Sequence, residues 1–355
     1  LFERSGKLFP QSEIVSRLPD KSLRRHTYGQ YYQRTRALAA TLKKLGLRKG
    51  DRVATLCWNH HAHLECYFGI PAAGGVMHTL NLRLFPEQLT YIANHAEDRV
   101  LMYDAQFQPI IDRLKPHLKT VEHFIVFDSD DSYGALMRDM DGAFDWVMGD
   151  ERDPCMLCYT SGTTGNPKGV LYQHRSTMLH AMAEIAPSIF DLSCAAVLLP
   201  IVPMFHAASW GLPFAGAAAG VKFVFSTTND APTLHKLMRE EGVTHSAGVP
   251  TVWLAMFQHL DATAKPAAMP GSANCGWSPL AGQQRQGLAE RPAGARPSRL
   301  QPANRDLPNA RRTADGHQHA GDRCWKRARE RAFAGDRRRA AVDHPACWIA
   351  WTPGL

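Results

Sequence analysis

Short, continuously apolar segments alternate with amphipathic segments through the first 265 residues of this 355-residue chain, and no other feature constrains its fold as strongly. The apolar segments have the length of strands that are buried on both faces. The amphipathic segments repeat apolar residues at helical spacing. This alternation predicts an α/β fold with parallel sheets flanked by helices. Such sheets bind ligands in loops at the carboxyl ends of their strands.

Local start and stop signals place the expected elements. Thr27 and Gln30 form a capping box, and Gly46 favours the end of the helix that follows. No apolar run is long enough to cross a membrane, so no membrane-spanning helix is expected. Strands are expected at 52–58, 99–103, 124–127, 155–159, 197–199, 221–225 and 243–246, and helices at 31–45, 85–95, 175–185, 232–241 and 250–260.

The last quarter of the chain differs in composition from the rest. From Gly271 onward it holds 15 of the 41 basic residues and 7 of the 33 acidic ones, so the net charge of +8 lies there and residues 1–270 are neutral. Leu, Ile, Val and Phe are too scarce in it to build a core. A disordered basic tail, a nucleic-acid-binding arm and a segment translated in the wrong reading frame remain open. We therefore expect a partial folded domain at 1–268 and a low-hydrophobicity tail at 269–355.

The strongest chemical signal is the segment YTSGTTGNPKGV, from Tyr159 to Val170. Glycines let the backbone approach a ligand and turn N–H groups toward anions. Hydroxyls add donors for phosphate oxygens and an oxygen ligand for Mg²⁺, and Lys168 adds a positive charge. The segment is not a Walker A loop, in which Gly, Lys and Ser or Thr are adjacent. Its place between an apolar strand and a helix predicts a phosphate-binding loop rather than a surface turn.

This segment resembles the signature loop of the AMP-forming adenylating enzymes, and residues 10–265 resemble medium- and long-chain fatty acyl-CoA synthetases. The resemblance implies the incomplete N-terminal domain of the adenylate-forming α/β fold. It implies ATP-dependent activation of a fatty acid through an acyl-adenylate to an acyl-CoA thioester, with ATP, Mg²⁺ and coenzyme A, and it allows a homodimer. The other motifs that carry it are NLRLFP from Asn81, NHAED from Asn94, PIVPMFH from Pro200, WGLP from Trp210 and GVPTVW from Gly248.

The resemblance also implies roles for individual residues. Thr160 would contact Mg²⁺ and phosphate, and His206 would lie beside the carboxylate and the α-phosphate. Trp210 would gate the fatty-acid tunnel, with Gly211 next to it. The phosphates would be covered by Ser161, Gly162, Thr163, Thr164, Gly165 and Lys168, and the acyl pocket would be lined by Gly248, Val249, Pro250 and Thr251.

The chain departs from the family pattern in two places. Ala207 and Ala208 stand where relatives usually carry Val-Asn. Beyond about Ala268 neither the adenine segment nor the small lysine domain is recognisable, and Lys326 has different neighbours. We therefore expect the lysine domain to be absent and the chain to be a truncated, impaired form that is a fragment at both ends. The alternatives are a catalytically inactive fragment and an adenylating ligase for another carboxylic acid.

The remaining candidate clusters have structural interpretations. Cys155 and Cys158 have metal-like spacing without a second pair, so we expect buried strand cysteines. His60, His61 and His63 lack the His-Glu-x-x-His order, and we expect solvated imidazoles at a helix start. Eight scattered cysteines without a signal peptide predict a cytoplasmic protein. The tail lacks regularly interleaved aromatic residues, so we expect no nucleic-acid partner.

Overall fold

The structure is a computed structural model that describes residues 1–127, 133–134, 146–160, 167–263 and 272–275. Within it, residues 1–275 form one compact unit that contains two six-stranded sheets. No helix among these described residues is long and apolar enough to cross a membrane. The α/β class with mostly parallel strands is therefore confirmed.

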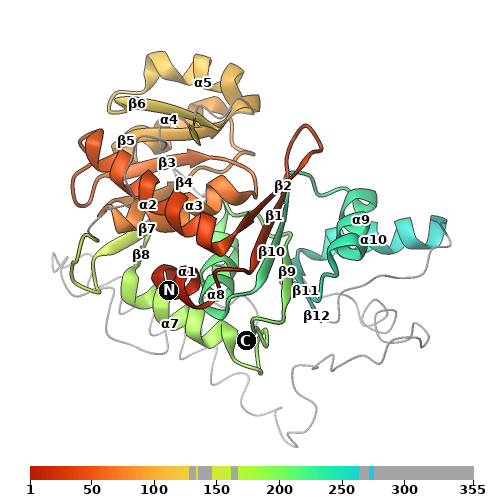
Figure 1. The fold of residues 1–355 in the computed structure, drawn as a ribbon. Coiled ribbons are helices and arrows are strands. Elements are labelled where there is room, and N and C mark those ends of the chain that lie inside the picture. Colours follow the sequence, from red (N-terminus) through yellow and green to blue (C-terminus); the bar gives the residue numbers. More distant parts are fainter. Residues whose placement is uncertain (128–132, 135–145, 161–166, 264–271, 276–355) are drawn as a thin grey trace, which may run out of the picture. The chain divides into compact units, whose positions relative to one another are not determined.

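One sheet, called the first sheet below, has the order β6-β5-β3-β4-β7-β8, and only its β7–β8 pair is antiparallel. Its inner strands carry almost uninterrupted apolar residues because both faces are covered. α2 and α3 pack on one face, and α4 and α5 pack on the other (Figure 1). The elements are β3 (Arg52–Leu56), β4 (Val76–Thr79), β5 (Asp98–Asp104), β6 (His123–Phe127), β7 (Pro154–Thr160), β8 (Lys168–Gln173), α2 (Tyr28–Lys44), α3 (His61–Ala72), α4 (Pro86–Ala96) and α5 (Gln108–Leu114), with short 3-10 turns η1 (Ala105–Phe107) and η2 (Lys115–His117).

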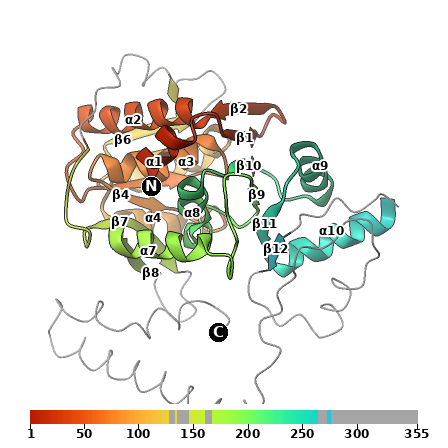
Figure 2. The same cartoon turned by 60° about the horizontal axis from the view of Figure 1, so that its bottom comes forward.

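The second sheet has the order β12-β11-β9-β10-β1-β2, and only its β1–β2 pair is antiparallel. α9 and α10 cover one face, where Figures 1 and 2 show them side by side next to β9 and β11. α8 packs on the other face. The elements are α1 (Phe2–Leu8), β1 (Glu13–Arg17), β2 (Leu23–Thr27), α7 (His174–Ile185), β9 (Val197–Pro200), η3 (Ala207–Gly211), α8 (Leu212–Ala219), β10 (Lys222–Ser226), α9 (Ala231–Glu241), β11 (His245–Gly248), α10 (Pro250–Thr263) and β12 (Ser272–Cys275).

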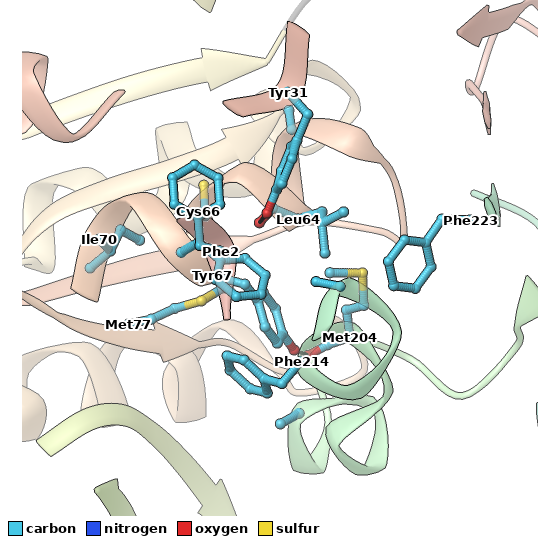
Figure 3. Close-up of a cluster of buried hydrophobic side chains, with 14 of the residues drawn as sticks. Phe2, Tyr31, Leu64, Cys66, Tyr67, Ile70, Met77, Met204, Phe214 and Phe223 are labelled. Carbon is cyan, nitrogen blue, oxygen red and sulfur yellow. Dashed lines mark hydrogen bonds between the residues drawn. The ribbon is translucent and has the colours of Figure 1, made fainter. Parts of the chain in front are cut away.

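One large apolar cluster joins the two sheets across α3 and α8. Figure 3 shows Tyr67 of α3 between Met204 and Phe214, which belong to the second sheet's connections. The Tyr67 hydroxyl donates a 2.5 Å hydrogen bond to the Met204 carbonyl, and its ring lies 5.3 Å from that of Phe214. The sheets therefore share a core, and this core fixes the segment that leads to His206.

Every strand and helix expected from the sequence is present, and most boundaries agree within two residues. The capping box at the start of α2 is formed, since Thr27 Oγ1 accepts from the Gln30 N–H at 3.2 Å. Strands β1, β2, β4, β8 and β12 and helices α1, α5 and α8 were not anticipated, and only the start of α3 was expected.

Candidate functional site

Thr160 and Lys168 face each other across the open end of an antiparallel hairpin. Thr160 is the last residue of β7 and pairs in register with Lys168, the first residue of β8. Both residues are exposed. Within the described part of the chain, the Thr160 hydroxyl makes one long contact, 3.4 Å to the Lys168 carbonyl, so its oxygen can still accept from a ligand or bind a cation there. The hairpin places Thr160 opposite Lys168 at the carboxyl end of a buried strand.

This hairpin corrects one sequence expectation. The phosphate loop was expected to lead from a strand into a helix, but β8 intervenes before α7 begins at His174. β8 is an edge strand with several exposed residues and Gly169, so it has no apolar run that would reveal it. The intervening candidates Ser161, Gly162, Thr163, Thr164 and Gly165 lie outside the described residues.

Asn59 fixes the segment that leads to His206. Its side chain is buried, and its Nδ2 donates to the carbonyls of Pro200 and Val202, each at 3.0 Å. Its Oδ1 accepts from the Met204 N–H at 2.7 Å. One amide thus satisfies three backbone groups that follow β9. The sequence analysis missed this residue because its partners lie more than 140 positions away in the chain.

His206 follows this clamped segment and has an exposed side chain. Partial desolvation by the surrounding turn lowers the pKa of His206, and the nearby Arg83 guanidinium lowers it further. The imidazole is therefore neutral at pH 7 and can donate one hydrogen bond and accept another. Arg83 was part of a quoted motif, but its charge was not recognised as belonging to this site.

The turn after His206 has an unusual backbone. Ala207, Ala208, Ser209 and Trp210 all have φ between 46° and 58°, in the left-handed region, and Gly211 has φ 89°. L-residues pay roughly 1–2 kcal/mol each for this conformation, whereas glycine does not. Ser209 holds the turn, because its buried hydroxyl donates to the Val202 carbonyl at 2.7 Å. Trp210 is half-buried and packs against the core shared by the two sheets.

Cys158 connects this turn with the phosphate-loop hairpin. It lies on β7 two residues before Thr160 and is 7% exposed. Burial raises the pKa of its thiol, and polar neighbours that include the Thr79 hydroxyl, 3.3 Å from the sulfur, partly oppose this shift. Cys158 and Ala208 belong to the same buried cluster, so the turn of the second sheet and the strand that carries Thr160 share a core.

The Gly248–Thr251 segment lies at the end of β11, beside the start of the connection to His206. The backbone N–H groups of Ile201 and Val202 both donate to the Ala247 carbonyl, at 2.9 and 3.0 Å. Gly248 is buried and its carbonyl accepts from Trp253 Nε1 at 3.2 Å. Val249 and Thr251 are exposed and Pro250 starts α10.

The histidines at the start of α3 contradict one expectation. They do start a helix, with His60 as its N-cap, but His60, His61 and His63 are 4%, 4% and 0% exposed rather than solvated. The reason is that α3 is enclosed on nearly all sides, between its own sheet, α2 and the second sheet. Burial, and secondarily the charge of His60, lowers the pKa of His63 to about 3.

Potential metal ligands meet at one buried point. Cys57, His60 and Asp104 place ligand atoms within 4.8 Å of one another. The imidazole and carboxylate are already hydrogen-bonded at 2.6 Å, and Asp104 also accepts from the Trp58 N–H at 2.9 Å. These bonds give the cluster a structural role in capping α3. Cys155 and Cys158 are buried on β7, as expected.

Comparisons with known proteins agree with this architecture. The profile of a family described as "AMP-binding enzyme" matches residues 2–334, which extends beyond the 265 reached by recognisable motifs. A long-chain-fatty-acid–CoA ligase of Thermus thermophilus is 45% identical over 270 residues, covering 74% of this chain and 49% of the relative. A 3-methylmercaptopropionyl-CoA ligase of Ruegeria lacuscaerulensis is 41% identical over 275 residues, covering 73% and 50%. The chain spans about half the length of the curated relatives it matches.

Solved structures show the same fold. The inhibitor-bound N-terminal domain of FACL13 from Mycobacterium tuberculosis superimposes with a TM-score of 0.74 at 27% identity, covering 81% of this chain and 71% of that one. A long-chain-fatty-acid-CoA ligase of Archaeoglobus fulgidus, at 21% identity, gives the same TM-score and covers 81% and 59%. The match to an N-terminal domain agrees with the part of the fold that the sequence predicted.

Proposed function

The chain belongs to the AMP-binding enzyme family, and we propose that it serves the ATP-dependent activation of a fatty acid, through an acyl-adenylate, to an acyl-CoA thioester. The observation that carries this proposal is the hairpin at the carboxyl end of β7, which pairs Thr160 with Lys168. Cys158, two residues before Thr160, and Ala208, two residues after His206, belong to the same buried cluster. This shared core supports a site to which the hairpin and the imidazole both contribute.

The first step would be attack of the fatty-acid carboxylate on the α-phosphorus of ATP, with pyrophosphate as the leaving group. The coenzyme A thiol would then displace AMP and form the thioester. Neither step requires a covalent bond to the protein, so catalysis depends on positioning and on stabilising negative charge. Thr160 and Lys168 would bind phosphate oxygens, while neutral His206 would donate a hydrogen bond near the carboxylate.

The available groups fit Mg²⁺ only in part. The Thr160 hydroxyl is exposed and weakly engaged, and a hard oxygen ligand of this kind suits the ion that accompanies ATP. Bound there, Mg²⁺ would neutralise phosphate charge. The chain's own contribution is then to hold the hydroxyl and Lys168 on the same side of the hairpin end.

Exchange of radiolabelled pyrophosphate into ATP tests the first step directly. With saturated fatty acids of about six to sixteen carbons, we expect the unaltered chain to exceed a Thr160→Ala, Lys168→Ala double variant by about 100-fold or more, because phosphate contacts stabilise charge in the transition state. Lys236→Ala is the matched control, since that lysine is exposed on α9 at 73%. An unaltered chain no faster than the double variant with any acid would overturn the proposal.

A second candidate acid class deserves inclusion in the same assay. The 41% identical relative named for 3-methylmercaptopropionyl-CoA is nearly as similar as the fatty-acid ligases. Short acids that carry a heteroatom should therefore be tested beside the saturated series. Faster exchange with them than with any saturated acid would assign the chain to another carboxylic acid.

A further inference from the structure

Glu184 is a buried carboxylic acid that the proposed chemistry does not use. It lies in the last turn of α7 and is 5% exposed. Its Oε2 accepts no hydrogen bond within the described part of the chain. The His180 imidazole lies one turn earlier, with Nδ1 3.6 Å from Oε2, which is too long for a hydrogen bond.

Burying a carboxyl group lowers the stability of the folded chain unless a hydrogen-bonding partner compensates for the lost contact with water. A buried polar group without a hydrogen bond costs about 1–3 kcal/mol. Burial also raises the pKa of Glu184 well above its usual value, which favours the neutral acid. A neutral carboxyl offers one O–H donor and an acceptor oxygen.

Glu184 lies next to the turn that follows His206. α7 packs against both α8 and η3. A Cβ atom on Gly211 would overlap the His180 ring and would lie 2.7 Å from Glu184 Oε2. Because residue 211 has no side chain, the carboxyl lies directly against the backbone next to Trp210. The same turn carries the residues expected to border the acyl chain.

We propose that the Glu184 carboxyl is a polar subsite of the acyl pocket and that it favours acids whose chain carries a hydroxyl or a similar hydrogen-bonding group. This inference rests on the proposed function, which places the acyl chain beside Trp210 and Gly211. A hydroxyl on the acyl chain can donate a hydrogen bond to one carboxyl oxygen and accept a hydrogen bond from the carboxyl O–H. A plain alkyl chain leaves the buried carboxyl unsatisfied and binds less well.

Equilibrium binding tests this selectivity without requiring turnover. Saturated acids of about four to ten carbons and their terminally hydroxylated counterparts are titrated against the chain by displacement of a fluorescent fatty acid. At the best-fitting length we expect the hydroxy acid to bind about tenfold more tightly than the plain acid, the ratio that one net hydrogen bond supplies. In Glu184→Leu that ratio should fall to about one or below, because the hydroxyl then meets an alkyl group.

Two further variants separate a specific role from a structural one. Glu184→Gln keeps a donor and an acceptor, so it should retain most of the ratio. Glu151→Gln changes an exposed acid, 62% accessible, and should leave the ratio unchanged. A Glu184→Leu chain that folds and keeps the wild-type ratio overturns the inference while leaving the proposed function intact. If neither class of acid displaces the probe and no acid supports pyrophosphate exchange, both proposals fail.

Discussion

Three backbone groups near His206 depend on a single buried side chain. Asn59 follows β3 of the first sheet, whereas Pro200 ends β9 of the second sheet and Val202 and Met204 come after it. Its amide carries two N–H donors and an acceptor oxygen in one plane, so a single side chain can serve all three backbone groups. The hydrogen bonds of this one side chain therefore link the two sheets through residues that are more than 140 positions apart in the sequence.

We expect Asn59→Ala to lower the free energy of unfolding by about 3 kcal/mol, because it leaves several buried backbone groups unsatisfied. Asn94→Ala is the control, since that side chain bonds to the His117 carbonyl and the Lys119 N–H at an exposed position where water can substitute. Urea denaturation followed by circular dichroism measures both. Equal losses in the two variants would contradict the role assigned to Asn59.

Some elements were predictable from the sequence because their burial is uniform, although β4 is equally buried and was not anticipated. β7 and β9 are continuously apolar because helices cover both faces, and this pattern can be read from the sequence alone. β2 and β8 were not predictable, since they are antiparallel edge strands with charged and exposed residues. The same limit applies to the site: Thr160 and Lys168 follow from a local motif, whereas Asn59 and Arg83 act through contacts made only after folding.

The start of α3 predicts how stability depends on pH. The pKa of His63 is lowered to about 3 and that of His61 well below its ordinary value, in both cases mainly by burial. The unfolded chain therefore binds more protons than the folded chain between about pH 6.5 and 3. The free energy of unfolding should fall through that window as pH decreases, by up to about 1.4 kcal/mol per pH unit for each histidine.

Urea denaturation at a series of pH values from 7 to 4 measures this slope. His63→Gln removes one of the two buried imidazoles and should give a shallower dependence than the unaltered chain. His117→Gln alters an exposed imidazole and should leave the dependence as it was. A slope that His63→Gln does not change would show that this histidine is not the acid-sensitive group.

At the scale of the whole molecule, the two sheets share one core and should unfold together. Tyr67, Met204 and Phe214 belong to this core, and residues 1–275 form the compact unit. A chain ending at Cys275 should therefore unfold in one cooperative transition, with a midpoint close to that of the full chain. Thermal unfolding of both forms by calorimetry checks this. Loss of the cooperative transition on truncation would show that residues 276–355 are required for the folded unit.

The turn from Ala207 to Trp210 is, in stereochemical terms, a short piece of mirror-image helix made from L-residues. Its four residues hold conformational energy that right-handed backbone would release. The hydrogen bond from the Ser209 hydroxyl to the Val202 carbonyl helps to hold this left-handed conformation. The segment between His206 and Gly211 would therefore lower its conformational energy by changing from left-handed to right-handed backbone, and a bound substrate would lie beside this segment. Substituting D-alanine for Ala208 by chemical ligation would relieve this energy without altering the side chain.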